Sequence, residues 1–220
     1  IHLLDLMFSA VVQVVHHELC TGTIFTAALT GDMASVQCAV QIDKSFATST
    51  DEYGATPLML AAQGKHPGLV LTLTSAGADV NAVDHRGRNA GHYAAVSNCG
   101  EVLGMLGAYQ FNFNAPDQDD VVPLAALVQA GNMSAAQIAV QNGAVVDCIC
   151  RTGRTGLHAA VVAGDTEAIQ QWLRLGANPD KPVVDRERQT PLMLATTLTE
   201  PLEAMQLLLD AGANPNKPGC

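Results

Sequence analysis

The residue types in this chain that could perform chemistry cluster in two places, His16-His17-Glu18 and Cys148-x-Cys150. A helical zinc site of the His-Glu-x-x-His type needs a second histidine one turn beyond the glutamate, and none follows Glu18. The two cysteines are separated by a single residue and have no matched second pair, which argues against a zinc site there. We therefore expect no metal ion to be bound.

Motifs for covalent or phosphate chemistry are missing too. No glycine-rich phosphate loop follows an expected strand, and no Gly-x-Ser-x-Gly elbow is present. The sequence thus predicts no catalytic residue, no cofactor and no small-molecule substrate for these 220 residues. It leaves open an enzyme whose active site lies in another part of a longer protein.

The composition predicts a folded, acidic protein. Hydrophobic residues make up 48% of the chain and charged residues 15%, which favours a packed core over disorder. The formal net charge is −10, which argues against nucleic acid and anionic membranes as partners and favours basic or apolar proteins. No apolar run reaches the roughly 18 residues of a membrane span, so no membrane insertion is expected.

The first residues and the cysteines bear on location. The stretch from Ile1 to Val15 is apolar, but Asp5 and Gln13 interrupt it and no basic region precedes it, which argues against a signal peptide. Because the first residue is not methionine, we expect the chain to be part of a longer protein. The six cysteines follow no disulfide framework, which predicts reduced thiols and an intracellular, cytoplasmic protein.

A repeated pattern organises most of the sequence. It joins a Thr-Pro-Leu or a variant of it, a pair of small residues, an apolar helical run and a closing Gly-Ala-Asp or Gly-Ala-Asn. The pattern is clearest from Thr56 to Asn81 and returns from Thr155 and from Thr190. Spacings of 34, 33, 33, 33 and 35 residues separate six equivalent positions: Ile24, Leu58, Gly91, Leu124, Leu157 and Leu192.

With this pattern the chain resembles the ankyrin repeat, whose period is near 33 residues. The resemblance implies an all-α fold, an ankyrin-repeat α-solenoid of stacked helix–turn–helix units with projecting β-turns. It covers about residues 22–216, within an array of residues 22–220 whose repeats start near 22, 56, 89, 122, 155 and 190. Residues 1–21 lack the pattern, and their apolar residues at helical spacing predict a helix that caps the array. A partner-binding helix is the alternative.

Local signals agree with two-helix units. Thr56 and Thr190 are suited to cap helices, and Pro57 and Pro191 suit the first helical position, where an N–H would lack a partner. The third repeat departs from the pattern, because Gln110 stands where a glycine is expected to close the second helix. The closing glycines of other repeats are Gly77, Gly143, Gly176 and Gly212.

The resemblance gives structural roles to three further residues. His92 and His158 occupy the family's Thr-Pro-Leu-His position, where the imidazole bonds to the backbone near the turn. Trp172 falls at a position of the second helix that faces the core, so we expect it to pack there. A binding role for Trp172 is the alternative.

The projecting turns are the expected binding surface. In the family the turn tips and the first helices line a concave face that grips protein partners, and loops on a rigid scaffold concentrate binding residues. The tips alternate between acidic and basic, which predicts a charge pattern that fixes the register of a partner. Alternatively, these charges are solvated, and pairs between adjacent tips add stability. The expected contact residues are Tyr53, Met59, Gln63, His85, Arg86, Arg88, Tyr93, Val96, Asp117, Asp119, Asp120, Arg151, Arg154, Arg186 and Arg188.

The sequence therefore favours a protein–protein interaction scaffold or adaptor that binds a protein partner without turnover. One alternative is a non-catalytic regulatory or targeting region of a larger enzyme or channel. Another is a structural scaffold in a large cytoskeletal or ciliary assembly.

Overall fold

A computed structural model of the chain describes residues 24–184 and 188–217. The expected capping helix of residues 1–21 and the expected contact residue Arg186 lie outside these ranges. Within them the regular structure is helical and contains no β-strand. The all-α fold class is thereby confirmed.

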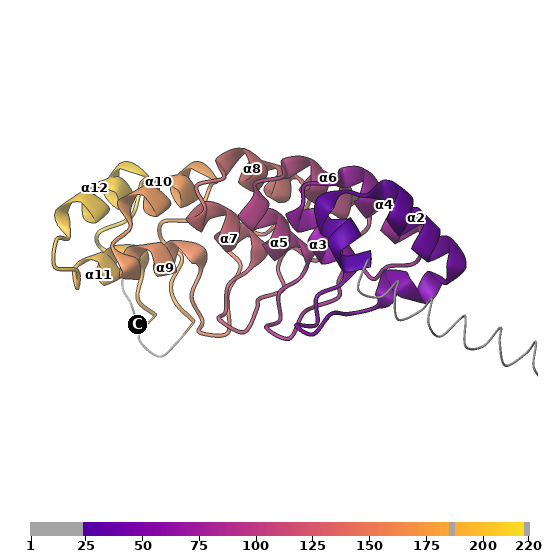
Figure 1. Ribbon diagram of the computed structural model, residues 1–220. Coiled ribbons are helices and arrows are strands. Elements are labelled where there is room, and N and C mark those ends of the chain that lie inside the picture. Colours follow the sequence, from indigo (N-terminus) through magenta and orange to yellow (C-terminus); the bar gives the residue numbers. More distant parts are fainter. Residues whose placement is uncertain (1–23, 185–187, 218–220) are drawn as a thin grey trace, which may run out of the picture. The chain divides into compact units, whose positions relative to one another are not determined.

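The chain divides into two compact units, and the division falls between Gln110 and Phe111. The described part of unit 1, residues 24–110, holds three helix pairs (Figure 1). Its helical segments are residues 24–30 with α2 (Met33–Ile42), the 3-10 turn η1 (Lys44–Thr48), α3 (Pro57–Gln63) with α4 (Pro67–Ser75), and α5 (Ala90–Ser97) with α6 (Gly100–Ala108). Unit 2 also holds three pairs: α7 (Pro123–Gln129) with α8 (Met133–Gln141), α9 (Gly156–Ala163) with α10 (Thr166–Arg174), and α11 (Pro191–Ala195) with α12 (Leu202–Asp210).

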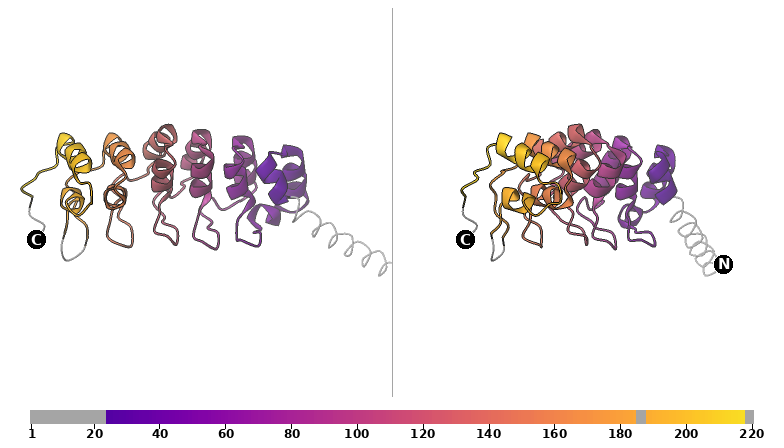
Figure 2. Two further views of the ribbon diagram at one scale, coloured as in Figure 1. Left: turned by 60° about the vertical axis from the view of Figure 1, so that its left-hand side comes forward. Right: turned by 90° about the vertical axis from the view of Figure 1, so that its left-hand side faces the viewer.

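Equivalent helices of successive pairs pack on each other within each unit. In unit 1, α3 contacts α5, and α4 contacts both α2 and α6. In unit 2, α9 contacts α11, and α10 contacts α12. Within each unit, Figure 2 shows the second helix of a pair lying over the first, while the chain between successive pairs projects as a long turn.

Small and large apolar side chains share the core in a way that explains this packing. Ala61 and Ala62 are fully buried, and their small size lets α3 lie close to its neighbours. Leu69 and Leu73 fill the layer of the second helices. Each fully buried leucine contributes about 1.5–3 kcal/mol to stability.

The predicted caps and structural histidines are confirmed. The side chain of Thr56 accepts a hydrogen bond from the Met59 N–H at 3.4 Å, and Thr190 caps α11 in the same way. The Nδ1 atom of His92 accepts from the Asn89 N–H at 3.2 Å. His158 repeats this bond with the N–H at the start of α9, also at 3.2 Å. Both imidazoles are buried at helix starts.

Left-handed residues close the five second helices from α4 to α12, as the sequence predicts for four of them, whereas α2 ends at the extended Asp43. The four expected glycines have φ angles between 91° and 103°, and Gln110 adopts φ 58° in the corresponding place. A side chain in this conformation costs about 1–2 kcal/mol relative to glycine. The strained residue is the last residue of unit 1.

Candidate partner-binding surface

A carboxylate organises each of three projecting turns. Oδ1 of Asp51 accepts hydrogen bonds from the backbone N–H groups of Tyr53, at 2.9 Å, and Ala55, at 2.8 Å. Asp84 and Asp117 lie one and two periods of 33 residues later and accept from the N–H groups two and four residues on, at 2.8–2.9 Å. Each carboxylate therefore helps to hold its own turn in shape.

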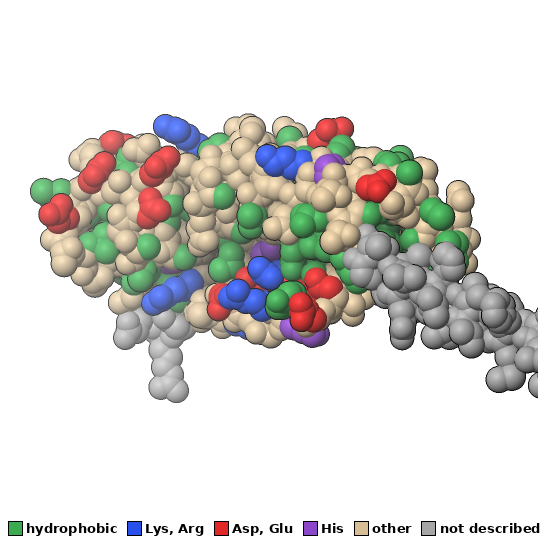
Figure 3. Space-filling model, viewed as in Figure 1, with side chains coloured by type: hydrophobic (Ala, Val, Ile, Leu, Met, Phe, Trp, Pro, Cys, Tyr) green, Lys and Arg blue, Asp and Glu red, His purple; other side chains and the backbone are tan. Residues whose placement is uncertain are grey.

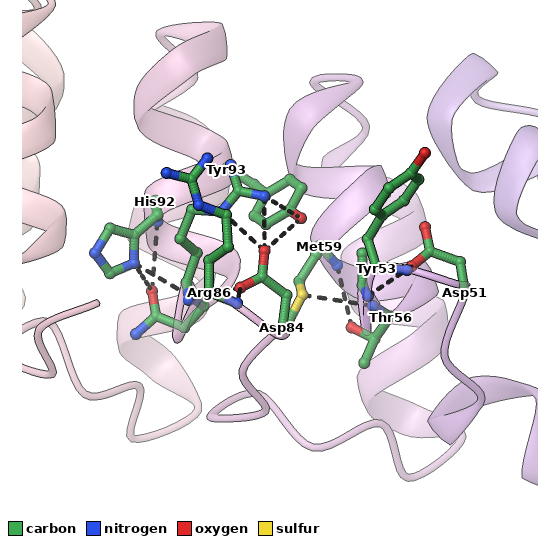
Figure 4. Close-up of polar contacts among 11 residues, drawn as sticks. Asp51, Tyr53, Thr56, Met59, Asp84, Arg86, His92 and Tyr93 are labelled. Atoms are coloured by element: carbon green, nitrogen blue, oxygen red, sulfur yellow. Dashed lines mark hydrogen bonds and ion pairs between the residues drawn. The ribbon is translucent and has the colours of Figure 1, made fainter. Parts of the chain in front are cut away.

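Asp84 has a second set of contacts, made by Oδ2. The guanidinium of Arg88 donates through Nε at 2.8 Å and brings a second nitrogen to 2.7 Å, and the Tyr93 hydroxyl donates at 2.9 Å (Figure 4). The Arg88 guanidinium carbon also lies 4.9 Å from the centre of the Tyr93 ring. Burial acts to raise the pKa of Asp84, but the hydrogen bonds from Arg88 and Tyr93 outweigh it and lower the pKa below its ordinary value. The carboxylate is therefore charged at neutral pH.

The same network changes the titration of Tyr93. Burial of the phenol and its hydrogen bond to Asp84 raise the pKa of Tyr93 to about 12. Since this folded-state pKa lies above the unfolded value near 10, the associated stability is complete below about pH 10 and is lost as the pH rises through about 12.

We expect the tyrosinate absorbance of the chain, which has three tyrosines, to contain a component that ionises near pH 12. Tyr93→Phe should remove that component and leave the rest of the curve in place. Tyr109→Phe is the matched control, because Tyr109 is a partly exposed residue at the end of α6. A late component that survives Tyr93→Phe would contradict the assignment.

The fourth turn has Cys150 where the other three have aspartate. Its backbone closes in the same way, since the Cys150 N–H donates to the Arg154 carbonyl and the Gly153 N–H to the Cys150 carbonyl, both at 2.9 Å. Burial and the nearby Asp120 carboxylate raise the pKa of the Cys150 thiol to about 11. The thiol stays protonated at neutral pH, which makes it a poor nucleophile and metal ligand.

Cys150→Asp is expected to stabilise unit 2 by about 1 kcal/mol. The new carboxylate would meet the backbone N–H and the guanidinium of Arg154, as Asp84 meets Arg88, while the Thr152 N–H already donates to Asp120 and repulsion from Asp120 limits the gain. The urea midpoint measures the effect. Cys150→Ser, which adds no charge, is the control and should change little. A loss of stability on introducing the carboxylate would show that the fourth turn differs from the others.

Asp120 links two neighbouring turns of unit 2. It has φ 65° at a place where three other turns have glycine, Gly54, Gly87 and Gly153, and its carboxylate accepts from the N–H groups of Arg151, at 2.8 Å, and Thr152, at 3.0 Å. Desolvation acts to raise the pKa of Asp120, but these hydrogen bonds outweigh it and lower the pKa below its ordinary value. Contacts between adjacent tips thus occur at this point, as the alternative interpretation of the tip charges expected.

A hollow of about 390 Å³ opens on unit 1, where the first helices meet the turn tips. Tyr53 is 65% exposed, whereas Tyr93 is only 9% exposed and is fixed by its bond to Asp84. Acidic, basic and apolar side chains lie next to one another on the side of the projecting turns (Figure 3). The hollow is lined by Phe25, Thr26, Leu29, Asp51, Tyr53, Ala55, Leu60, Gln63, Arg88 and Tyr93.

The structure brings four of the expected contact residues into this hollow: Tyr53, Gln63, Arg88 and Tyr93. Other expected contact residues lie on the surface outside the hollow, with Asp120 partly exposed: His85, Arg86, Val96, Asp119, Asp120, Arg151, Arg154 and Arg188.

Two expected contact residues are buried and serve the fold instead. Met59 is 1% exposed, and its sulfur accepts a hydrogen bond from the Thr56 N–H at 3.4 Å, so it points into the helix start (Figure 4). Asp117 is 7% exposed because its carboxylate is turned into its own turn. The expectation that these two side chains face a partner is therefore wrong.

Sequence reasoning missed the apolar part of the hollow. Phe25 and Leu29 lie one helical turn apart in the first helix, and Leu60 lies in α3. Leu29 is 41% exposed and Phe25 is half-buried, so both contribute apolar surface to the hollow. The pair at positions i and i+4 is the signal that pointed to this face.

In residues 24–184 and 188–217, no three side chains of His, Cys, Asp or Glu come together as ligands for a metal ion. Among the helices described, none has the length and apolar character needed to cross a bilayer.

The sequence matches the family described as ankyrin repeats, in three copies, over residues 24–117 and again over residues 124–218. Rabankyrin-5 of Homo sapiens is 33% identical over 144 residues, which are 64% of this chain and 12% of that protein. Inversin of Homo sapiens is 30% identical over 180 residues, which are 81% of this chain and 17% of that protein. The chain thus spans a small part of the length of these relatives.

A solved structure shows the same fold. The crystal structure of the ankyrin repeat domain of Bcl-3, described as a unique member of the IκB protein family, superposes with a TM-score of 0.75. The match covers 90% of this chain and 89% of that domain at 24% sequence identity.

Proposed function

The chain belongs to the ankyrin-repeat family, and we propose that it binds another protein through the hollow face of unit 1. The observation that carries this proposal is an exposed tyrosine beside an apolar hollow whose wall is held rigid by the Asp84–Arg88–Tyr93 network. Tyrosine and arginine dominate the binding energy of protein interfaces, and a wall that is already ordered loses little entropy on binding. The hollow fits an apolar side chain presented by the partner.

A protein partner is favoured over nucleic acid because the net charge is −10. The four cysteines in the described part of the chain are free thiols, which supports the expected intracellular location. The small share of rabankyrin-5 and inversin that the chain matches supports the alternative that the array acts as the non-catalytic interaction region of a larger protein.

Quantitative affinity capture with matched variants tests the proposed face. Tyr53→Ala is expected to reduce capture of the main partner by roughly tenfold or more, because it removes a contact at the centre of the face. Tyr109→Ala is the control, since Tyr109 is an exposed tyrosine of unit 1 outside the hollow. Equal capture by the two variants would place the binding face elsewhere.

Charge reversal tests the charge pattern of the turns separately. Arg86→Glu, Arg151→Glu and Arg154→Glu change side chains that are exposed. Arg88 is left unchanged because its guanidinium holds the buried Asp84 carboxylate, so its reversal would disturb the turn itself. We expect the triple variant to slow association and to lower its dependence on salt. An unchanged rate and salt dependence would show that these arginines do not face the partner.

A further inference from the structure

The chain has three tyrosines, and their hydroxyl groups lie in three different settings. Tyr93 is buried and donates to the Asp84 carboxylate at 2.9 Å, so its hydroxyl is already used inside the fold. Tyr109 ends helix α6 and is 37% exposed. Tyr53 is 65% exposed and lies at the tip of the first projecting turn. Of the three, Tyr53 is therefore the most accessible to another enzyme.

The side chain of Tyr53 makes no hydrogen bond within the described residues. The bonds of this residue come from its backbone: the N–H donates to Asp51 Oδ1 at 2.9 Å, and the carbonyl accepts from the His85 N–H at 3.0 Å. Figure 4 shows the phenol ring pointing away from its turn, with no marked bond at the hydroxyl. The turn therefore presents this hydroxyl to approaching molecules while it stays folded.

The chain around Tyr53 lies outside the helices and carries acidic side chains. Residues 49–56 connect η1 to α3, and Asp51 and Glu52 directly precede the tyrosine. By contrast, the residues before Tyr109 are small, uncharged and part of α6. An exposed turn can be drawn into the active site of another enzyme by a local opening, whereas Tyr109 can enter only if the end of α6 unwinds.

We propose that Tyr53 is a site of phosphorylation by a tyrosine kinase that selects acidic residues before the tyrosine. Kinases choose their substrates partly by charge pattern, and Asp51 and Glu52 supply two carboxylates for a basic substrate groove. The kinase transfers the γ-phosphoryl group of ATP to Tyr53 Oη. The bond from the γ-phosphorus to the bridging oxygen breaks as the bond from Oη to phosphorus forms. The phenol proton passes to the carboxylate base of the kinase, and ADP leaves.

Phosphorylation of Tyr53 has a consequence for binding, and this consequence rests on the proposed function of the hollow. Tyr53 lines the hollow together with apolar side chains and the Asp51 carboxylate. A phosphate adds a charge of about −1.5 to −2 at pH 7, which an apolar side chain of a partner would have to desolvate. Arg88 also lines the hollow, but its guanidinium already pairs with Asp84 at 2.7 Å, so it offsets only part of the added charge. Phosphorylation therefore releases the partner from this face.

Phosphate transfer to the intact chain tests the site without any partner. The chain is incubated with ATP, Mg²⁺ and the catalytic domain of a tyrosine kinase that prefers acidic residues before tyrosine, and mass spectrometry follows phosphate at each tyrosine. We expect transfer to Tyr53 to be roughly tenfold or more faster than transfer to Tyr109, and Tyr93 to stay unmodified. Tyr53→Phe should abolish the fast transfer. Tyr109→Phe is the matched control and should leave it unchanged.

Glu52→Gln tests the charge pattern that precedes the tyrosine. The substitution keeps the size of an exposed side chain and removes one of the two carboxylates. We expect it to slow transfer to Tyr53 by roughly threefold to tenfold, because the attraction to a basic groove is weakened. Faster transfer to Tyr109 than to Tyr53, no transfer to the folded chain, or an unchanged rate in Glu52→Gln would overturn the proposal.

Affinity capture with the phosphorylated and the unmodified chain tests the consequence for binding. We expect phosphorylation to reduce capture of the main partner by roughly tenfold or more, and phosphatase treatment to restore it. If Tyr53→Ala weakens capture but phosphorylation does not, the switch is overturned and the binding face stays in place. If neither weakens capture, the binding face is wrong and the switch falls with it, while the transfer rates still decide the phosphorylation site.

Discussion

Asp84→Ala is expected to lower the free energy of unfolding of unit 1 by about 2–4 kcal/mol, because the buried carboxylate accepts several hydrogen bonds while its partner Arg88 is partly exposed. The Asp84 side chain is fully buried and accepts from two backbone N–H groups, the Arg88 guanidinium and the Tyr93 hydroxyl. Alanine leaves these donors without their acceptor. A donor that stays buried then has neither a protein partner nor water to bond, which destabilises the folded state. Native-state hydrogen exchange in α3 and α5 measures the loss.

Asp51→Ala is the matched control for this substitution. Asp51 makes the same two backbone bonds in the preceding turn but pairs with no arginine or tyrosine in the described residues. Its replacement should cost only about 1–2 kcal/mol. The difference between the two variants isolates the contribution of the Arg88–Tyr93 contacts. Equal costs would mean that these contacts add nothing to stability.

The contribution of Asp84 to the free energy of unfolding should also depend on pH. Because the folded-state pKa of Asp84 is below its ordinary value of 3.8, its contribution is complete above the unfolded-state pKa and is lost as the pH falls through the folded-state pKa. The gap in stability between the parent chain and Asp84→Ala should therefore narrow below about pH 4. A gap that stays constant to low pH would show that the charge of the carboxylate is unimportant.

Gly156→Ala is expected to destabilise unit 2 by about 1–3 kcal/mol, although alanine is the better helix former. Gly156 is the first residue of α9, and a Cβ there would overlap the ring of Trp172, which is 3% exposed and packs against the glycine backbone. The corresponding residue of other repeats is proline or alanine, at Pro57, Ala90, Pro123 and Pro191. The burial of Trp172 confirms its predicted packing role. Its contact with residue 156 explains why that residue is glycine.

The same substitution should change sign when the tryptophan is replaced. Trp172→Leu alone leaves a cavity and should cost roughly 2–4 kcal/mol. In that background Gly156→Ala has room for its Cβ and is expected to stabilise unit 2 by about 1 kcal/mol, the difference in helix propensity. Urea denaturation of the four chains gives the coupling directly. If the effects of the two substitutions on the free energy of unfolding are additive, the close packing of the ring against the glycine has no energetic consequence.

Features that repeat with the period of the chain could be predicted from the sequence. Thr56 caps a helix and Gly77 closes one because both roles depend on a few neighbouring residues and on φ. The roles of His92 and His158 followed from the family position they occupy. These signals are local, so a single sequence carries them in full.

Features that depend on the direction of a side chain were harder to predict. Asp117 was assigned to the surface because it lies in a projecting turn, but its carboxylate bonds the N–H groups two and four residues on. The repetition of aspartate at Asp51, Asp84 and Asp117 with the period of the core was the available signal. The hollow on unit 1 arises where separate repeats meet, and no local pattern describes such a junction.

The carboxylate at the base of each turn has a consequence for how such a chain can evolve. Because Asp51 holds the backbone of its turn from below, the side chain of Glu52 at the apex of that turn carries neither of the two bonds through which Asp51 maintains its shape. Drift at the apex positions is therefore nearly neutral for folding, and new specificities can arise there without prior gains in stability.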